Sequence, residues 1–318
     1  MMLSRVPFSK LSGLCFAVLL AACTSAAPNA QIWGDKGSLP GQFNEPFDVA
    51  VDQQGLVYVT DVRNRRVQEF NADGTFLRAF GRNLFEKPGG IGVGPDGSIW
   101  VTDFDLDRVF RFNSKGKLLA AWGKAGDGSG AFNVPADVAV DSKGFVYVVD
   151  EYHHRIQKFM PDGRFIRTWG EKGKVNVVLS AMNFLLPTMR QSEFYYPSRI
   201  SIGPDDRVYV SDAYNNRVQV FDTKGRFLQA IGGMGLWGGR FRVAAGIAAA
   251  SDGSLYVGDF YNNRVQHFDG KGNYLAEWGQ TGRAPGHFNG PTGVAIAPDG
   301  SLLVTDWGNH RIQKFLLD

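Results

Sequence analysis

The sequence has little cysteine, little surplus of either charge and few charged residues overall. Its 318 residues include two Cys, and the formal net charge is +3, of which Arg5 and Lys10 supply two. A nearly neutral body lacks the basic surplus of a phosphate-binding surface, so we expect no nucleic-acid partner. Two Cys exclude a disulfide framework. What the chain has in quantity is 40 Gly and 13% aromatic residues, which indicates a folded body with many turns rather than disorder.

The first 22 residues have the pattern of a secretory signal peptide. Two basic residues precede an apolar run over 11–20, which is shorter than the roughly 20 residues of a membrane-spanning helix. The run leads into Leu-Ala-Ala-Cys at 20–23, which resembles the bacterial lipobox, where the Cys becomes acylated and is residue one of the mature protein. We therefore predict a lipoprotein with a signal peptide over 1–22, acylation at Cys23 and a short tether over 23–30.

Cysteine usage and the next residue extend this prediction to a compartment. Cys15 lies in the discarded segment and Cys23 would carry the lipid, so the folded body has no thiol. Thr24 stands where inner-membrane retention signals of Gram-negative lipoproteins usually carry Asp. That resemblance implies a protein of the bacterial cell envelope, attached by its lipid to the outer membrane.

The rest of the chain, residues 31–318, contains six copies of one unit. Each copy has an Asp that ends an apolar segment and an Arg five positions later: Asp61/Arg66, Asp103/Arg108, Asp150/Arg155, Asp212/Arg217, Asp259/Arg264 and Asp306/Arg311. Successive Asp residues are 42, 47, 62, 47 and 47 positions apart, a spacing typical of propeller blades. Because all six units repeat the pair, we expect it to fasten loops rather than to catalyse a reaction.

Each unit is predicted to form four strands. In the third unit the strands are expected over 137–140, 145–149, 155–159 and 165–169, with turn-forming residues between them. The last unit lacks an outermost strand, and Ile32-Trp33 can supply it by pairing beside the strand that ends at Phe315. The sequence thus predicts an all-β protein, a six-bladed β-propeller of four-stranded blades whose last blade is closed by an N-terminal strand.

The units resemble those of the NHL-repeat family of six-bladed propellers. The segments closest to the family pattern are Asn-His-Arg-Ile-Gln at 309–313 and Asn-Asn-Arg-Val-Gln at 262–266. The resemblance covers residues 31–318 and implies a propeller fold over that whole range.

Two enzyme classes with related propellers suggest where a metal could bind. Peptidyl-hydroxyglycine lyases hold zinc through His near the start of each innermost strand. The six units here carry Phe47, Gly89, Ala136, Ser198, Ala244 and Thr292 at that position. Lactonases hold an axial calcium, and the next position offers Asp48, Gly90, Asp137, Arg199, Ala245 and Gly293. Asp48 and Asp137 are weak metal candidates, because two carboxylates fall short of the six to eight oxygen ligands of calcium.

The differences between the units indicate where a partner would bind. The loops between the second and third strands carry aromatic and charged residues, and a single Arg lies at an innermost-strand position: Arg63, Phe104, Tyr152, His153, Tyr214, Tyr261, Trp307 and Arg199. An apolar insertion over 171–193 is expected on the same face. Such residues are enriched at binding hot spots, although they can also simply cover the loops.

We interpret the chain as a non-catalytic binding scaffold for a protein or a small ligand of unknown identity. No catalytic residue and no cofactor is expected. The alternative is a metal-dependent lyase or lactonase-type enzyme with a divalent cation, since Asp48 and Asp137 leave that option open.

Replacing Cys23 with Ser is expected to release the protein from the membrane fraction. The reason is that stable anchoring requires more than one acyl chain, and no other Cys remains in the mature body to carry them. Cell fractionation followed by immunoblotting measures the outcome. A Ser variant that stays membrane-bound would show that Cys23 is not the anchor.

Overall fold

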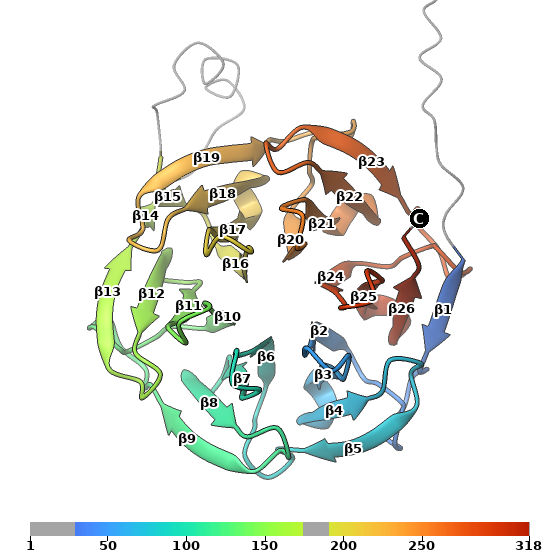
Figure 1. Cartoon of the computed structure of the whole chain (residues 1–318), viewed down its shortest axis with the longest axis horizontal. Coiled ribbons are helices and arrows are strands. Elements are labelled where there is room, and N and C mark those ends of the chain that lie inside the picture. Colours follow the sequence, from blue (N-terminus) through green and yellow to red (C-terminus); the bar gives the residue numbers. More distant parts are fainter. Residues whose placement is uncertain (1–28, 174–190, 318) are drawn as a thin grey trace, which may run out of the picture.

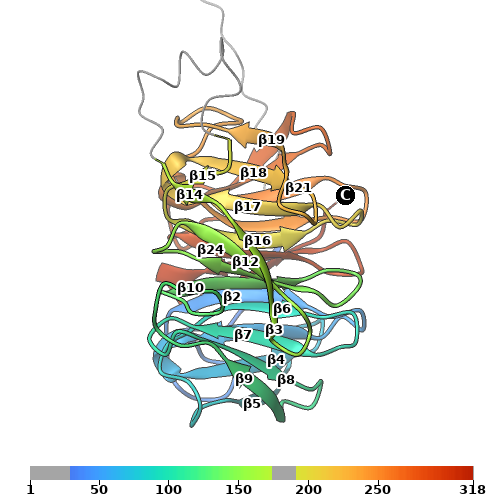
Figure 2. The same cartoon turned by 90° about the vertical axis from the view of Figure 1, so that its left-hand side faces the viewer.

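The computed structural model describes residues 29–173 and 191–317, which form a ring of six antiparallel four-stranded sheets around a central channel (Figure 1). Figure 2 shows the same ring from its edge, with loops at both faces. The predicted fold is therefore confirmed. Within the described ranges, no helix is long and apolar enough to cross a membrane.

The strands of the first three blades follow one another from the channel outward. Blade one consists of β2 (Pro46–Val51), β3 (Val57–Asp61), β4 (Arg66–Phe70) and β5 (Phe76–Phe80). Blade two consists of β6 (Pro88–Val93), β7 (Ile99–Asp103), β8 (Arg108–Phe112) and β9 (Leu118–Trp122). Blade three consists of β10 (Pro135–Val140), β11 (Val146–Asp150), β12 (Arg155–Phe159) and β13 (Phe165–Trp169). The bounds of β12 and β13 are those predicted from the sequence for the third and fourth strands of this unit.

The other three blades repeat this order. Blade four consists of β16 (Pro197–Ile202), β17 (Val208–Asp212), β18 (Arg217–Phe221) and β19 (Phe227–Gly232). Blade five consists of β20 (Ala244–Ala249), β21 (Leu255–Asp259), β22 (Arg264–Phe268) and β23 (Tyr274–Trp278). Blade six consists of β24 (Pro291–Ile296), β25 (Leu302–Asp306), β26 (Arg311–Phe315) and, outermost, β1 (Ala30–Trp33).

The core lies between neighbouring blades rather than inside one sheet. The second strand of every blade is buried along its whole length, because each of its faces packs against another blade. One cluster, for example, joins Val57 and Phe70 of blade one to Leu303 and Ile312 of blade six. Outermost strands such as β5 are only partly buried. Apolar residues on both faces of the inner strands therefore favour this stacked ring.

The repeated Asp fastens loops, as predicted, and in five of the six blades it also pairs with the Arg. There the Asp carboxylate is fully buried and lies 2.7–2.9 Å from the Nε of the Arg five positions later. In blade two only the pairing with Arg is wrong, because Arg108 is exposed and makes no ion pair within the described ranges. Asp103 instead accepts four backbone N–H groups, from Glu86, Lys87, Asp105 and Leu106.

The N-terminal strand closes the ring, as predicted. All four residues of β1 pair with β26, from Ala30 beside Phe315 to Trp33 beside Ile312. Phe315 in turn pairs with Leu302, which follows the turn between the first and second strands. Both ends of the described chain therefore leave the ring at the face formed by these turns, which we call the a–b face. The loops between second and third strands form the opposite b–c face.

The ends of the predicted insertion rejoin beside blade four. Two-residue strands β14 (Glu171–Lys172) and β15 (Glu193–Phe194) pair in parallel, and Phe194 is fully buried. Residues 174–190 lie outside the described part of the chain. The proposed recognition role of 171–193 therefore stays a prediction.

Replacing Trp33 with Ala is expected to destabilise the fold by about 3–5 kcal/mol, the typical cost of truncating a buried Trp. Trp33 is 6% exposed and its ring lies 6.2 Å from that of Phe70 in the next blade. Denaturant unfolding measures the change. Ile32→Ala on the same strand is the matched control, because Ile32 is 40% exposed and should lose much less. Equal effects of the two substitutions would contradict the role assigned to Trp33.

Candidate functional site

Two successive positions of each innermost strand are predicted to lie around the channel, and the strand register corrects the predicted alignment of blade five. Ala244 pairs with Asp259 as Pro291 pairs with Asp306, so Ala244 occupies the position of the Pro that begins the other strands. The two channel positions of blade five are therefore Ala245 and Gly246, one residue later than expected. None of the corrected positions adds a metal ligand.

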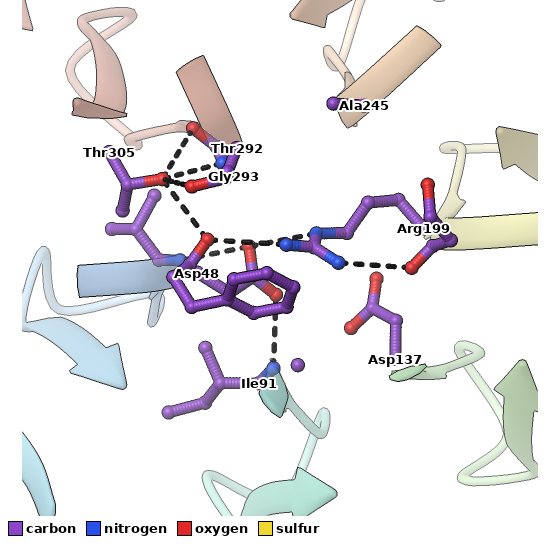
Figure 3. A network of polar contacts seen from close by, with 12 residues as sticks. Asp48, Ile91, Asp137, Arg199, Ala245, Thr292, Gly293 and Thr305 are labelled. Atoms are coloured by element: carbon purple, nitrogen blue, oxygen red, sulfur yellow. Dashed lines mark hydrogen bonds and ion pairs between the residues drawn. The ribbon is translucent and has the colours of Figure 1, made fainter. Parts of the chain in front are cut away.

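Arg199, from β16, reaches across the channel (Figure 3). Its Nε lies 3.8 Å from Oδ1 of Asp48, and its Nη1 and Nη2 donate to the backbone oxygens of Ser198 at 3.0 Å and Phe47 at 3.2 Å. The guanidinium also stacks on the Phe47 ring, with Cζ 3.9 Å from the ring centroid. Arg199 is only 3% exposed. Its side chain thus lies across the channel and links blade four to blade one.

Asp48 and Asp137 hold neighbouring blades together. Asp48 accepts the backbone N–H of Ile91 in blade two at 3.0 Å, and Asp137 accepts that of Ile200 in blade four at 2.9 Å. The Asp137 carboxylate fits only because blade two has Gly90 beside it, where a Cβ would overlap the carboxylate. Because these hydrogen bonds join neighbouring blades, they support a structural role for Asp48 and Asp137.

The two carboxylates do not form a fitting site for a divalent cation. Their oxygens already accept backbone N–H groups, and the cation that faces them is the Arg199 guanidinium. Burial raises the pKa of both Asp48 and Asp137, and the charge of Asp48 raises that of Asp137 further, while Arg199 opposes both shifts. In the described parts of the chain, no three His, Cys, Asp or Glu side chains lie close enough together to hold a metal ion.

A funnel opens on the b–c face above Arg199 and Phe47. It has two lobes, of about 220 and 480 Å³, which share Phe47, Glu151, Phe260 and Thr292 in their walls. Aromatic side chains dominate the lining: Phe47, Phe104, Tyr152, Tyr196, Tyr214, Phe260, Tyr261 and Trp307. A largely apolar, concave wall with few polar groups is the usual character of a small-molecule site. We call these two lobes the funnel.

The structure brings seven of the eight residues predicted for partner binding to this funnel. Arg63, Phe104, Tyr152 and Trp307 line the larger lobe, and Arg199, Tyr214 and Tyr261 line the smaller one. His153 lines neither lobe. Its Nδ1 lies 3.0 Å from Asp150, and its Nε2 lies 2.8 Å from Asp127. His153 therefore links the loop that contains Asp127 to the buried Asp150 of its own blade.

Glu151 is a funnel residue that the sequence analysis did not single out. It follows the repeated Asp of blade three, and the same position of the other blades carries Val62, Phe104, Ala213, Phe260 and Trp307. All six of these residues line the funnel, so Glu151 is the one acid in an otherwise apolar ring. A comparison of this position across the six units would have revealed it.

The Glu151 side chain is half-buried, and its carboxylate has no hydrogen-bond or ion-pair partner among the described residues. Burial raises its pKa to about 7, although the charges of Arg199 and Lys87 oppose the shift. A carboxyl group with a pKa near neutrality in a cavity is characteristic of functional sites. Glu151 is therefore the group in the funnel that is poised to interact with a ligand.

Replacing Glu151 with Gln is expected to stabilise the protein at pH 8 but to change little at pH 5. The folded chain holds this proton up to about pH 7 and the unfolded chain loses it near 4.5, so the carboxyl destabilises the fold increasingly between these values. The gain at pH 8 is at most about 3 kcal/mol. Denaturant melts at both pH values measure it, with Glu86→Gln, an exposed carboxylate paired with Arg65, as control. Equal effects at the two pH values would contradict the raised pKa.

Three comparisons relate the chain to known proteins. It is 46% identical to the B-box type zinc finger protein ncl-1 of Caenorhabditis elegans over 44 residues, which are 14% of this chain and 5% of that protein. A streptogramin B lyase structure superposes with TM-score 0.63 and 16% identity, and the match covers 91% of this chain and 98% of the lyase chain. A gluconolactonase structure from Xanthomonas campestris superposes with TM-score 0.63 and 15% identity, and the match covers 92% of this chain and 98% of the gluconolactonase chain. At such identities the two structures show a shared fold alone.

The family pattern matches five blades of the ring. The NHL repeat is found at residues 43–70, 132–159, 194–221, 241–268 and 288–315. Blade two, whose Asp103 and Arg108 do not pair, lies outside these ranges. The five matched repeats and the six-bladed ring show that this chain belongs to the NHL-repeat propeller family.

Proposed function

We propose that this protein is a non-catalytic binding propeller that takes its ligand in the funnel on the b–c face. The observation that carries this proposal is Glu151, a half-buried carboxylate that lines an aromatic cavity and has no hydrogen-bond or ion-pair partner among the described residues. Partial burial makes the ionised carboxylate less favourable, and a ligand that donates hydrogen bonds to it offsets part of that cost. Loop fastening does not require such a group, since the other five blades have apolar residues there.

The shape of the site supports binding from one side. The funnel opens on the b–c face above the stacked Arg199 and Phe47, so we expect a ligand to enter from that face. Tyr152, Tyr214 and Tyr261 are each about half exposed around this entrance. Exposed tyrosines offer large contact areas with little loss of side-chain freedom, which suits both a small ligand and a protein loop.

The metal-dependent alternative has weaker support. The lyase and the gluconolactonase share this fold, but what their names say of their reactions belongs to them. In this chain the carboxylates nearest the axis bind backbone N–H groups and face a guanidinium. The donor set at the channel therefore favours a structural role over metal chemistry.

The location of the protein is a further part of the proposal. The Leu-Ala-Ala-Cys motif at 20–23 supports a lipid anchor at Cys23, and Thr24 supports the outer membrane as its destination. The seven residues from 24 to 30 reach at most about 25 Å when extended, so the propeller would lie close to the membrane surface.

Small fragments are expected to bind the funnel of the full chain in mild detergent. Saturation-transfer NMR with cationic, neutral and anionic aromatic fragments measures this binding. A double variant, Tyr214→Ala with Tyr261→Ala, should bind these fragments at least about fivefold more weakly. Each of the two rings contributes contact area, and because both are about half exposed, their removal should disturb the fold little. Tyr274→Ala is the matched control, a partly exposed Tyr on β23 outside the funnel.

The outcomes separate the alternatives. Fragments that bind the wild type and Tyr274→Ala but not the double variant support the funnel. Absence of binding, or equal binding to all three proteins, would contradict it. Elemental analysis of the purified protein tests the enzyme alternative. A stoichiometric zinc or calcium ion that is lost in Asp48→Asn or Asp137→Asn would overturn the non-catalytic proposal.

A further inference from the structure

The charged residues that line the funnel are paired with one exception. Glu45 accepts from Arg63 at 2.9 Å, and the Lys87 ammonium lies 4.0 Å from Asp105. Arg199 is buried beneath Phe47 and faces Asp48 and Asp137. These pairs cancel their own charges locally. Glu151 is then the charged group of the described lining that has no counter-ion.

The walls around Glu151 are suited to a positive charge. Phe47 and Phe260 line both lobes together with Glu151, and Tyr214 and Tyr261 complete the smaller lobe. The faces of aromatic rings attract cations, and ammonium groups are commonly bound by several rings together with a carboxylate. Burial raises the pKa of Tyr214, and the proximity of Tyr261 and Glu151 adds to the shift, which places these polar groups close together.

We propose that the funnel binds an organic ammonium group, with Glu151 as its counter-ion and the surrounding aromatic rings as its walls. This inference rests on the proposed binding function and names its ligand class. The ammonium group can belong to a free alkylamine or to a Lys side chain of a peptide, since both present the same –NH₃⁺ head on an alkyl chain. An anion finds no free cation here, because Arg63, Lys87 and Arg199 each face a carboxylate.

The proposal implies a definite pH dependence. The groups that face Glu151 are Arg199 from β16, Lys87 from the loop before β6 and Tyr214 from η2 (Ala213–Asn215). Glu151 has a pKa of about 7, so its negative charge is lost as the pH falls through that value. Affinity for an ammonium ligand should therefore decrease about tenfold from pH 8 to pH 6.

Four probes test the ligand class and its source on the full chain in mild detergent. Butylammonium and its neutral analogue 1-butanol form one pair, and Nα-acetyl-lysine amide and Nα-acetyl-norleucine amide form the other. NMR titration of each gives a dissociation constant. At pH 8 each ammonium probe should bind at least about tenfold more tightly than its neutral analogue, because charge-assisted hydrogen bonds are about twice as strong as neutral ones.

Glu151→Gln should remove this preference and the pH dependence, while Glu86→Gln, which removes a carboxylate of the same face outside the funnel, should preserve both. If Glu151→Gln folds poorly, the pH series on the wild type gives the same test. A tighter Lys probe indicates a peptide ligand, and tighter butylammonium indicates a free amine; either supports the class.

The measurements distinguish a wrong ligand class from an absence of binding at the funnel. Equal affinity for the ammonium and neutral probes overturns the ammonium class, yet it leaves the funnel as a binding site. An ammonium preference that persists in Glu151→Gln also overturns it, since another group would then be the counter-ion. If no probe and no fragment binds the wild type, the proposed function fails together with the ligand class.

Discussion

The architecture depends on a carboxylate that is buried at the end of the second strand in each blade. Asp61 of blade one, for example, accepts the backbone N–H of Asn44, the side-chain amide of Asn64 and Nε of Arg66. A buried charge that loses such partners costs several kcal/mol, so these bonds hold their geometry strictly. They join the loop that enters a blade to the loop between its second and third strands. The b–c face is therefore a rigid platform on which individual side chains can vary.

The fold could be predicted because its determinants are local in sequence and repeated six times. The Asp and Arg of one unit are five residues apart, and the apolar strands alternate with clear turns. The errors occurred where a unit departs from the pattern. Blade five begins with Ala244 instead of Pro, which shifts the alignment by one residue. In blade two Arg108 is exposed and does not pair with Asp103, although Asp103 accepts the backbone N–H groups of its loops.

The site was harder to predict because it depends on contacts between distant blades. The entrance residues Tyr152, Tyr214 and Tyr261 were accessible to sequence reasoning, since they occupy equivalent loops. The contact of Arg199 with Asp48 joins blades four and one across the channel, and only the closed ring brings them together. Glu151 is detectable in the sequence, because the other five units carry an apolar residue at its position.

The position of the chain ends has a consequence for how the molecule faces its surroundings. Ala30 and Phe315 lie side by side at the a–b face, while the funnel opens at the b–c face. Any attachment at either end, whether a lipid in a bilayer or a tag on a solid support, therefore holds the propeller from behind. The funnel then points into the aqueous phase, and its occupancy could be followed on an immobilised layer of protein without chemical coupling near the ligand.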